Sequence, residues 1–238
     1  MCPAPLIASG FAAAADACAA RVLTLLGAAL AGQTVATFAI SGGSTPRLLF
    51  DRLAASGFPW DRVHVFWVDE RCVPPTDPAS NYRLAYEHLI GPAGIPEGNV
   101  HRVEGEREPH EAAARYVAEI RRFFQIEGED PPRFDVMHRG IGPDAHTASL
   151  FPGSPLIANR TGIAEPVYAP QFQQWRVTLL PAVLEAASHT VILASGSDKV
   201  EAVRGVFHGP GDPSRYPAQI AARQSEWFLD RAAAGDAV

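Results

Sequence analysis

The chain has 238 residues, of which 47% are hydrophobic and 19% charged, a composition typical of a folded protein and not of a disordered one. Its formal net charge of −6 argues against a broad nucleic-acid-binding surface, which would need an excess of Lys and Arg. The three cysteines, Cys2, Cys18 and Cys72, are far apart and include no CxxC pair. We therefore expect free thiols in a reducing compartment, the cytoplasm, with neither a disulfide framework nor a metal site.

Residues 11–30 are rich in Ala and Leu and resemble a secretory signal peptide in composition. No basic residue precedes them, however, and Asp16 and Arg21 interrupt the apolar run, so we expect a helix packed on the core. The chain shows no repeat, low-complexity linker or composition break, and we expect one domain over residues 1–238, not associated with a membrane. The sequence leaves open a monomer or a small homo-oligomer.

Apolar runs predict strands at 35–40, 63–68, 134–138, 167–169 and 190–194. Helical patterns lie between and after them, at 46–55, 80–90, 110–124, 181–187 and 198–207. This alternation predicts an α/β fold of the Rossmann-like type, with a mostly parallel sheet flanked by helices on both faces. In such folds ligands bind at the carboxyl ends of the strands, so the residues just after each strand are the candidates for a site.

Residues 41–46 (Ser-Gly-Gly-Ser-Thr-Pro) follow the first predicted strand and have the features of a phosphate-binding turn. Gly42 and Gly43 let the backbone approach a ligand, Ser44 is a natural N-cap, and Pro46 fits the first helical turn. Free N–H groups and the dipole of the following helix would then attract an anion. The same residues also fit an ordinary tight turn between a strand and a helix.

Three charged residues, Asp69, Glu70 and Arg71, directly follow the second predicted strand. The usual interpretation of such a run is a solvated loop with an internal ion pair. Its place at the carboxyl edge of the sheet favours a functional role, in which the planar guanidinium of Arg71 clamps a phosphate or carboxylate. Asp69 would either act directly or hold Arg71, and Asn81 would either line the site or cap the next helix.

The most informative segment is 134–152, where an apolar strand is broken by Gly140, Gly142 and a proline. Asp144 and His146 follow, two residues apart, at the expected start of a short helix that a second proline ends. A carboxylate beside an imidazole at such a turn is a common way to hold a general base where a ligand can reach it.

Residues 140–145 also match the loose dinucleotide-binding pattern G-x-G-x-x-A, and Glu165 follows at the distance that this pattern requires. This alternative is weakened by Asp144, which would bring negative charge against the pyrophosphate.

Two further cations lie near predicted strand ends. Arg176 is part of a mostly apolar segment, in which a buried charge needs a partner. Lys199 follows the last predicted strand and lies on the first turn of a helix, where it opposes the helix dipole and is expected to face an anion. Each also fits an ordinary surface side chain, but together with Ser44 they indicate one phosphate pocket.

Six short runs occur along the chain: SGGSTP (41–46), VDER (68–71), SNY (80–82), GPDAHTASLFPG (142–153), RVTLLP (176–181) and SGSDK (195–199). In this order they resemble the 6-phosphogluconolactonase family, from about Ser41 to the C-terminus. The resemblance implies an α/β fold related to that of glucosamine-6-phosphate deaminases. It also implies hydrolysis of 6-phosphogluconolactone to 6-phosphogluconate in the pentose phosphate pathway, with a phosphorylated sugar lactone as substrate and no metal or organic cofactor.

The resemblance further implies roles for single residues. His146 matches the family's proposed general base, and Asp144 matches the acidic residue that accompanies it. The phosphate would be held by the turn of Gly42, Gly43 and Ser44 and by the side chains of Arg71, Arg176 and Lys199.

The chain departs from the family pattern in two places. Ala145 stands where the family usually has Gly, so we expect an ordinary backbone angle there. His138 and Arg139 replace aliphatic residues at the end of a strand, and one interpretation is a structural ion pair with Glu70 or Asp135.

Two alternative functions stay open. Sugar-phosphate deaminases and isomerases of the same superfamily resemble the chain at 41–46 and at Asp144 and His146. They carry an acidic residue shortly after the histidine, and ring opening needs that second acid–base group. This chain has Ala-Ser-Leu-Phe at 148–151, which favours the lactonase. A non-catalytic sugar-phosphate sensor is the other alternative, and the intact Asp144–His146 pair argues against it, since a binding protein needs no general base.

Overall fold

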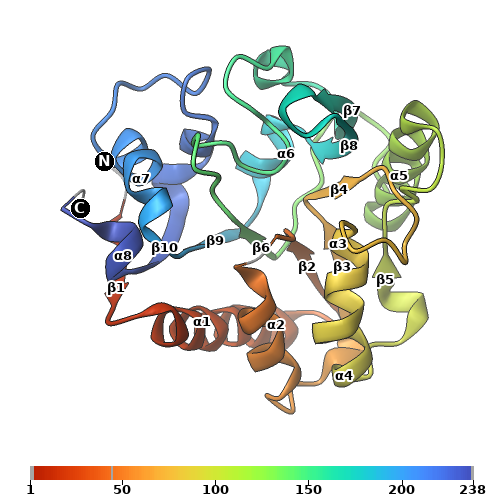
Figure 1. Ribbon diagram of the computed structural model, residues 1–238. Helices are drawn as coiled ribbons and strands as arrows, with labels where there is room; N and C mark the ends of the chain where they lie inside the picture. Colours follow the sequence, from red (N-terminus) through yellow and green to blue (C-terminus); the bar gives the residue numbers. More distant parts are fainter. Residues whose placement is uncertain (1–2, 44, 237–238) are drawn as a thin grey trace.

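The computed structural model describes residues 3–43 and 45–236 (Figure 1). The strands are β1 (Leu6–Ala8), β2 (Ala36–Ile40), β3 (Val63–Trp67), β4 (Asp69–Arg71), β5 (Val100–His101), β6 (Val136–Arg139), β7 (Ala164–Ala169), β8 (Gln174–Leu179), β9 (His189–Ala194) and β10 (Ser225–Asp230). The helices are α1 (Phe11–Gly32), α2 (Pro46–Ala54), α3 (Asn81–Ala85), α4 (Gly91–Ala93), α5 (Pro109–Phe124), α6 (Pro181–Ala186), α7 (Val200–Phe207) and α8 (Arg231–Ala234). A π-helical turn, Tyr86–Ile90, joins α3 to α4.

Seven strands form one parallel sheet in the order β1-β10-β9-β6-β2-β3-β5. Side chains alternate between its two faces. On β9, Val191 and Leu193 pack in the core cluster that contains α1, whereas Ile192 and Ala194 pack in a second cluster with α7 and α8. Helices therefore cover both faces of a parallel sheet, which confirms the predicted fold class.

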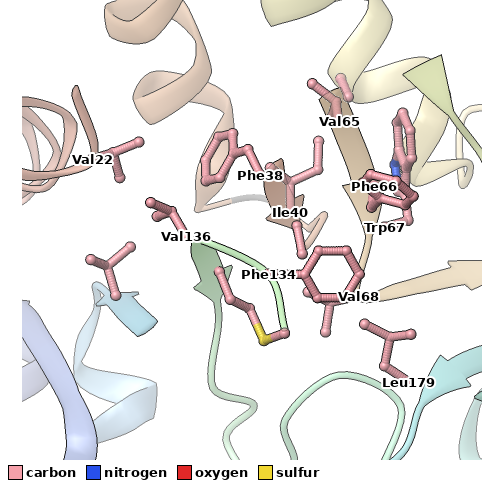
Figure 2. Packing of buried hydrophobic residues seen from close by; sticks show 14 of the residues in the cluster. Val22, Phe38, Ile40, Val65, Phe66, Trp67, Val68, Phe134, Val136 and Leu179 are labelled. Carbon is pink, nitrogen blue, oxygen red and sulfur yellow. The ribbon is translucent and has the colours of Figure 1, made fainter. Parts of the chain in front are cut away.

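The larger core is built from the central strands (Figure 2). Phe38 and Ile40 of β2, Val65 of β3 and Val136 of β6 are fully or almost fully buried in this core. All five residues of β2 are buried. Because both faces of these strands are covered, the strands carry continuous apolar runs rather than alternating ones.

The chain reverses its direction of travel across the sheet between β2 and β6. From β2 it moves outward to β3 and β5, and from β6 it moves the other way to β9 and β10. Such a reversal leaves a crevice beyond the carboxyl ends of the two central strands, and this is where α/β sheets bind ligands. The segments that follow Ile40 of β2 and Arg139 of β6 both begin at this point, so the fold brings the first and third predicted turns together.

A second, antiparallel sheet has the order β4-β8-β7. The strand predicted at 167–169 is part of β7 and belongs to this sheet, not to the parallel one as the alternation implied. Two of its strands hold predicted site residues, Arg71 on β4 and Arg176 on β8. Figure 1 shows β4, β8 and β7 together at the upper right, above β3.

Helix α1 matches the predicted N-terminal helix. By length and a mean hydropathy of 1.5 it is apolar enough to cross a membrane. Its residues Ala15, Cys18, Val22 and Leu26 are buried, however, and belong to the larger core cluster. This packing agrees with the expectation of a core helix.

Candidate active site

A cavity lies at the crevice between β2 and β6. The predicted site residues that line it are Gly42, Gly43, Asp69, Arg71, Asn81, His146, Arg176 and Lys199. Asp144 contacts the cavity through its partner His146. Ser44, the remaining predicted residue, lies outside the described residues.

The loop after β2 brings the N-terminus of α2 to the cavity. Helix α2 begins at Pro46 as predicted, with Thr45 in the N-cap position. Gly42 lies so close to Asn81 that a Cβ there would be 1.9 Å from Asn81 Oδ1. Gly43 has a φ of +104°, which lies in the left-handed region that favours glycine. The two glycines thus allow a turn that ends at a nine-residue helix, whose dipole favours an anion.

The charged run on β4 is not a solvated loop, because Asp69 and Glu70 are only 6% and 2% exposed. Glu70 accepts hydrogen bonds from three backbone N–H groups, including that of Asn81, and from Ser80 Oγ. Burial raises the pKa of Glu70 to about 7, although these backbone donors oppose the shift. Glu70 therefore fixes the start of α3, and with it Asn81, whose Nδ2 donates to the Asp69 carbonyl at 2.8 Å.

Asp144 and His146 form the pair that their spacing predicted. His146 Nδ1 lies 2.5 Å from Asp144 Oδ1, and the backbone N–H of His146 donates to the same oxygen at 3.1 Å. Burial opposes ionisation of Asp144, but its hydrogen bonds with His146 outweigh burial and lower the pKa of the carboxyl. With Nδ1 donating to a carboxylate, Nε2 is the acceptor nitrogen. The arrangement can accept a proton from water beside a bound ligand.

Ala145 has a φ of +65°, so the expectation of an ordinary backbone angle is wrong. This left-handed conformation costs a non-glycine residue roughly 1–2 kcal/mol. The loop holds it with backbone hydrogen bonds from Ala145 to Gly142, from Gly142 to His146, and from Ala218 to Ala145. These bonds offset the cost and set the position of His146 in the loop.

Residues 143–152 form turns, so the short helix expected there is wrong as well. A dinucleotide site of the G-x-G-x-x-A type needs its glycines to lead into a helix, and the observed turns contradict that interpretation. Thr147 Oγ1 donates to the Gly140 carbonyl, and Ser149 Oγ donates to Asp69, so the loop is tied to β6 and β4.

Three cations line the cavity, two from the antiparallel sheet and one from the segment before α7. Arg71 and Arg176 are direct partners in the β4–β8 register, and Lys199 precedes α7 and pairs with the exposed Asp198 at 3.0 Å. Burial lowers the pKa of Arg176, and the like charge of Arg71 adds to this while Asp69 opposes it. Among the described residues that line the cavity, Asp69 is the single carboxylate. The resulting excess of positive charge suits a phosphate dianion.

The position of Arg176 depends on residues that the sequence did not single out for the site. Ser149 is fully buried; its Oγ donates to Asp69 Oδ2 at 2.7 Å and lies 3.5 Å from Arg176 Nη1. The aromatic rings of Phe172 and Phe151 lie over the guanidinium, with centroids at 4.6 and 5.6 Å. The one signal in the sequence was that Ser149 and Phe151 belong to the matching run at 142–153.

The ion pair expected for His138 or Arg139 is wrong. Both carboxylates proposed as partners have other donors: Glu70 fixes the start of α3, and Asp135 Oδ2 accepts from the N–H and Oγ1 of Thr37 at 2.8 and 2.7 Å. Neither carboxylate has a cation as its partner among the contacts of the described chain.

His138 and Arg139 point to opposite faces of β6, as neighbours on a strand do. Arg139 is fully buried and donates through Nη2 to the Ile220 carbonyl at 2.8 Å. Burial lowers its pKa to about 10. His138 lines the cavity on the other face, with its ring edge-on to Phe50 of α2 at a centroid distance of 6.3 Å.

The buried imidazole of His138 predicts an acid-sensitive contribution to stability. Burial lowers its pKa from 6.5 to about 3, so between these values the unfolded chain binds a proton that the folded chain does not. The stabilising contribution is therefore complete above pH 6.5 and is lost as the pH falls. We expect His138→Leu to lose less stability than wild type on acidification. The difference between their free energies of unfolding should change in favour of the variant by up to about 1.4 kcal/mol per pH unit.

Urea unfolding at several pH values between about 7 and 5 measures this gap. His189→Leu, at an exposed position, is the control and should follow the wild-type pH dependence. Parallel stability curves for His138→Leu and wild type would contradict a buried neutral imidazole.

Cys18 and Cys72 are free thiols, as expected, and burial raises the pKa of both, that of Cys72 to about 11. Cys2 lies outside the described residues. Within 3–43 and 45–236, no group of three or more His, Cys, Asp and Glu side chains is arranged to hold a metal ion.

Comparison with known proteins shows which family the chain belongs to. The family model described as glucosamine-6-phosphate isomerases/6-phosphogluconolactonase matches residues 11–229. The chain is 36% identical over 215 residues to a 6-phosphogluconolactonase from Synechocystis sp., covering 89% of each chain. The solved 6-phosphogluconolactonase from Trypanosoma cruzi has a TM-score of 0.84 at 26% identity, over 98% of this chain and 97% of the other. A monomeric glucosamine-6-phosphate deaminase has a TM-score of 0.82 at 16% identity, over 98% and 99% of the two chains, and shows the shared fold alone. The chain belongs to the family of glucosamine-6-phosphate isomerases and 6-phosphogluconolactonases.

Proposed function

We propose that this protein is an enzyme that hydrolyses 6-phospho-D-glucono-1,5-lactone to 6-phospho-D-gluconate, in the oxidative branch of the pentose phosphate pathway. One observation carries the proposal: the His146–Asp144 pair lies after β6, beside a cavity lined by three cations. An imidazole held by a carboxylate suits a general base, and the cations suit a phosphate. The relatives named 6-phosphogluconolactonase support the same reaction.

In the proposed complex, the substrate phosphate binds at the turn of residues 42–44 and is held by Arg176 and Lys199. Arg71 lies beside either the phosphate or the lactone carbonyl. Asn81 donates a hydrogen bond to the Asp69 carbonyl, and Ser149 donates one to the Asp69 carboxylate. In this proposal Asn81 and Asp69 maintain the cavity wall next to Arg176. This arrangement leaves the lactone end of the substrate toward His146.

In the proposed reaction, Nε2 of His146 takes a proton from a water molecule as the water oxygen attacks the carbonyl carbon. A cation or a backbone N–H stabilises the oxyanion that forms, which is worth about 3 kcal/mol. The bond between that carbon and the ring oxygen then breaks, the ring oxygen takes the proton from the imidazolium, and the acid product ionises. Asp144 keeps the proton on Nδ1, so that Nε2 stays available as the base.

The first test measures proton release from freshly prepared lactone near neutral pH against the spontaneous rate. Acceleration by the protein supports the proposal, and no acceleration overturns it. In the latter case, ammonia release from glucosamine 6-phosphate would support a deaminase, and binding of 6-phosphogluconate without turnover would support a sensor. Ala148, Leu150 and Phe151 are buried and apolar, so the segment after His146 offers no second acid–base group for the deaminase reaction.

Lys199 is expected to act in phosphate binding. Because a charge-assisted hydrogen bond contributes about 1.5–3 kcal/mol, Lys199→Ala should raise KM by about tenfold or more and change kcat little. Steady-state kinetics measures both values. Arg204→Ala is the matched control, because Arg204 is an exposed cation of α7 that pairs with Glu201. A loss confined to kcat would mean that the phosphate site is misplaced.

We further propose that residues 1–238 form a single lactonase domain that acts in the cytoplasm, as a monomer or small homo-oligomer, without a metal or organic cofactor. The family match over 11–229 and two core clusters on opposite faces of one sheet support a single domain. The free thiols suit a reducing compartment, and the net charge of −6 suits a small-molecule substrate better than nucleic acid.

A further inference from the structure

The buried polar atoms that have no hydrogen-bond partner gather around the cavity. Within the part of the chain that the structure describes, such side-chain atoms occur in Ser41, Trp67, Arg71, His138, Arg139 and Arg176. Four of these six residues line the cavity: Ser41, Arg71, His138 and Arg176. Buried polar groups are nearly always bonded, and an unpaired one costs about 1–3 kcal/mol. These unpaired atoms therefore belong to residues of the wall of the cavity that is proposed to hold the substrate.

The proposed mechanism uses neither Ser41 nor His138, and of these two His138 has the larger number of unpaired atoms, both of its ring nitrogens. It is 1% exposed, and neither ring nitrogen has a partner in the described chain. In the β6–β2 ladder Met137 pairs with Ala39, so His138 lies beside the end of β2, just before Ser41, Gly42 and Gly43. Its ring also contacts Phe50, one turn into α2. His138 therefore lies under the turn and helix end that are proposed to hold the phosphate.

We propose that His138 is a substrate-binding residue, which donates one N–H from a neutral imidazole to a phosphoryl oxygen of the bound sugar phosphate. The proposal rests on the proposed function, because it takes the phosphate to lie beside Gly42, Gly43 and the start of α2. Burial keeps the imidazole uncharged near pH 7 by lowering its pKa to about 3, so the ring has one donor and one acceptor nitrogen.

The test compares wild type with His138→Leu, His138→Gln and His138→Asn, since the amide groups place a donor near Nε2 or Nδ1. Calorimetry measures the Kd of 6-phosphogluconate and of unphosphorylated gluconate, and kinetics measures KM and kcat. We expect His138→Leu to weaken 6-phosphogluconate binding about tenfold and to raise KM by a similar factor. Gluconate binding should not change, and one of the two amide variants should restore affinity to within about threefold of wild type.

Arg139→Leu is the matched control, because it makes the same change at the next buried polar residue, on the opposite face of β6. It should leave the affinity for 6-phosphogluconate unchanged. If His138 had a purely structural role, His138→Leu would weaken the binding of both ligands by the same factor, and neither amide variant would restore it.

His138→Leu protein that unfolds cooperatively and binds 6-phosphogluconate as tightly as wild type would overturn the proposal. If wild type binds gluconate as tightly as 6-phosphogluconate, the phosphate site of the proposed function fails, and the role of His138 fails with it. If His138→Leu does not fold, the amide variants decide: one of them retaining wild-type affinity supports the proposal, and a large loss in both overturns it.

Discussion

We expect His146→Ala to lower kcat for lactone hydrolysis by at least about 100-fold while KM changes little. His146 is held by Asp144 at 2.5 Å and lines the cavity, whereas the proposed phosphate contacts come from the cations and the turn after β2. A general base contributes to the transition state and not to phosphate binding, so its loss should leave ground-state affinity intact. Initial rates corrected for spontaneous hydrolysis measure both constants.

His189→Ala is the control for this experiment. His189 is an exposed residue at the amino end of β9, which is the end of the sheet opposite the cavity, and its loss should leave kcat at the wild-type value. A wild-type kcat in His146→Ala would remove His146 from the mechanism. A change confined to KM would assign it to substrate binding instead.

The second large effect is expected at Gly142, which has no side chain to take part in chemistry. A Cβ at this position would lie 2.0 Å from His146 Nδ1 and 2.7 Å from Asp144 Oδ1. Gly142→Ala must therefore push the imidazole off the carboxylate or shift the loop. A displacement of about 1 Å in a catalytic group can cost about 100-fold in rate, so we expect a kcat loss of that order with KM close to wild type.

Gly140→Ala tests whether the effect is specific to that contact. A Cβ at Gly140 would meet no atom within 4 Å, and the backbone there is not in the left-handed region. This variant should keep kcat within about twofold of wild type. Equal losses in both variants would mean that the loop tolerates no side chain, and wild-type activity in Gly142→Ala would contradict the close packing of Gly142 against His146.

The parallel sheet was predictable because strands covered on both faces carry continuous apolar runs. The predictions at 35–40 and 63–68 match β2 and β3 to within one residue at each end. Strands β4 and β8 were not predictable in the same way. Strand β4 has only three residues, and β8 mixes polar and apolar residues. Their arginines, Arg71 and Arg176, line the cavity and interrupt the apolar pattern.

Within the site, the sequence by itself determined the features that depend on local spacing. These are the glycine turn that leads into α2 and the Asp144–His146 pair, whose members are two residues apart. The sequence also indicated the cations Arg71, Arg176 and Lys199 from their places near predicted strand ends, and the resemblance to a known family supported them. Local spacing suffices in these cases because the backbone of a single turn sets the geometry.

Only the tertiary structure decided which distant groups meet. Ser149 bonds Asp69 across 80 residues of sequence, and Glu70 fixes the start of α3 rather than pairing with a cation. The left-handed angle of Ala145 and the unpaired ring of His138 were equally hidden, because each depends on segments that the sheet order brings alongside. The spacing of residues in the sequence determines the geometry within one turn. Contacts between turns depend on the strand order, and the strand order depends on how the whole core packs.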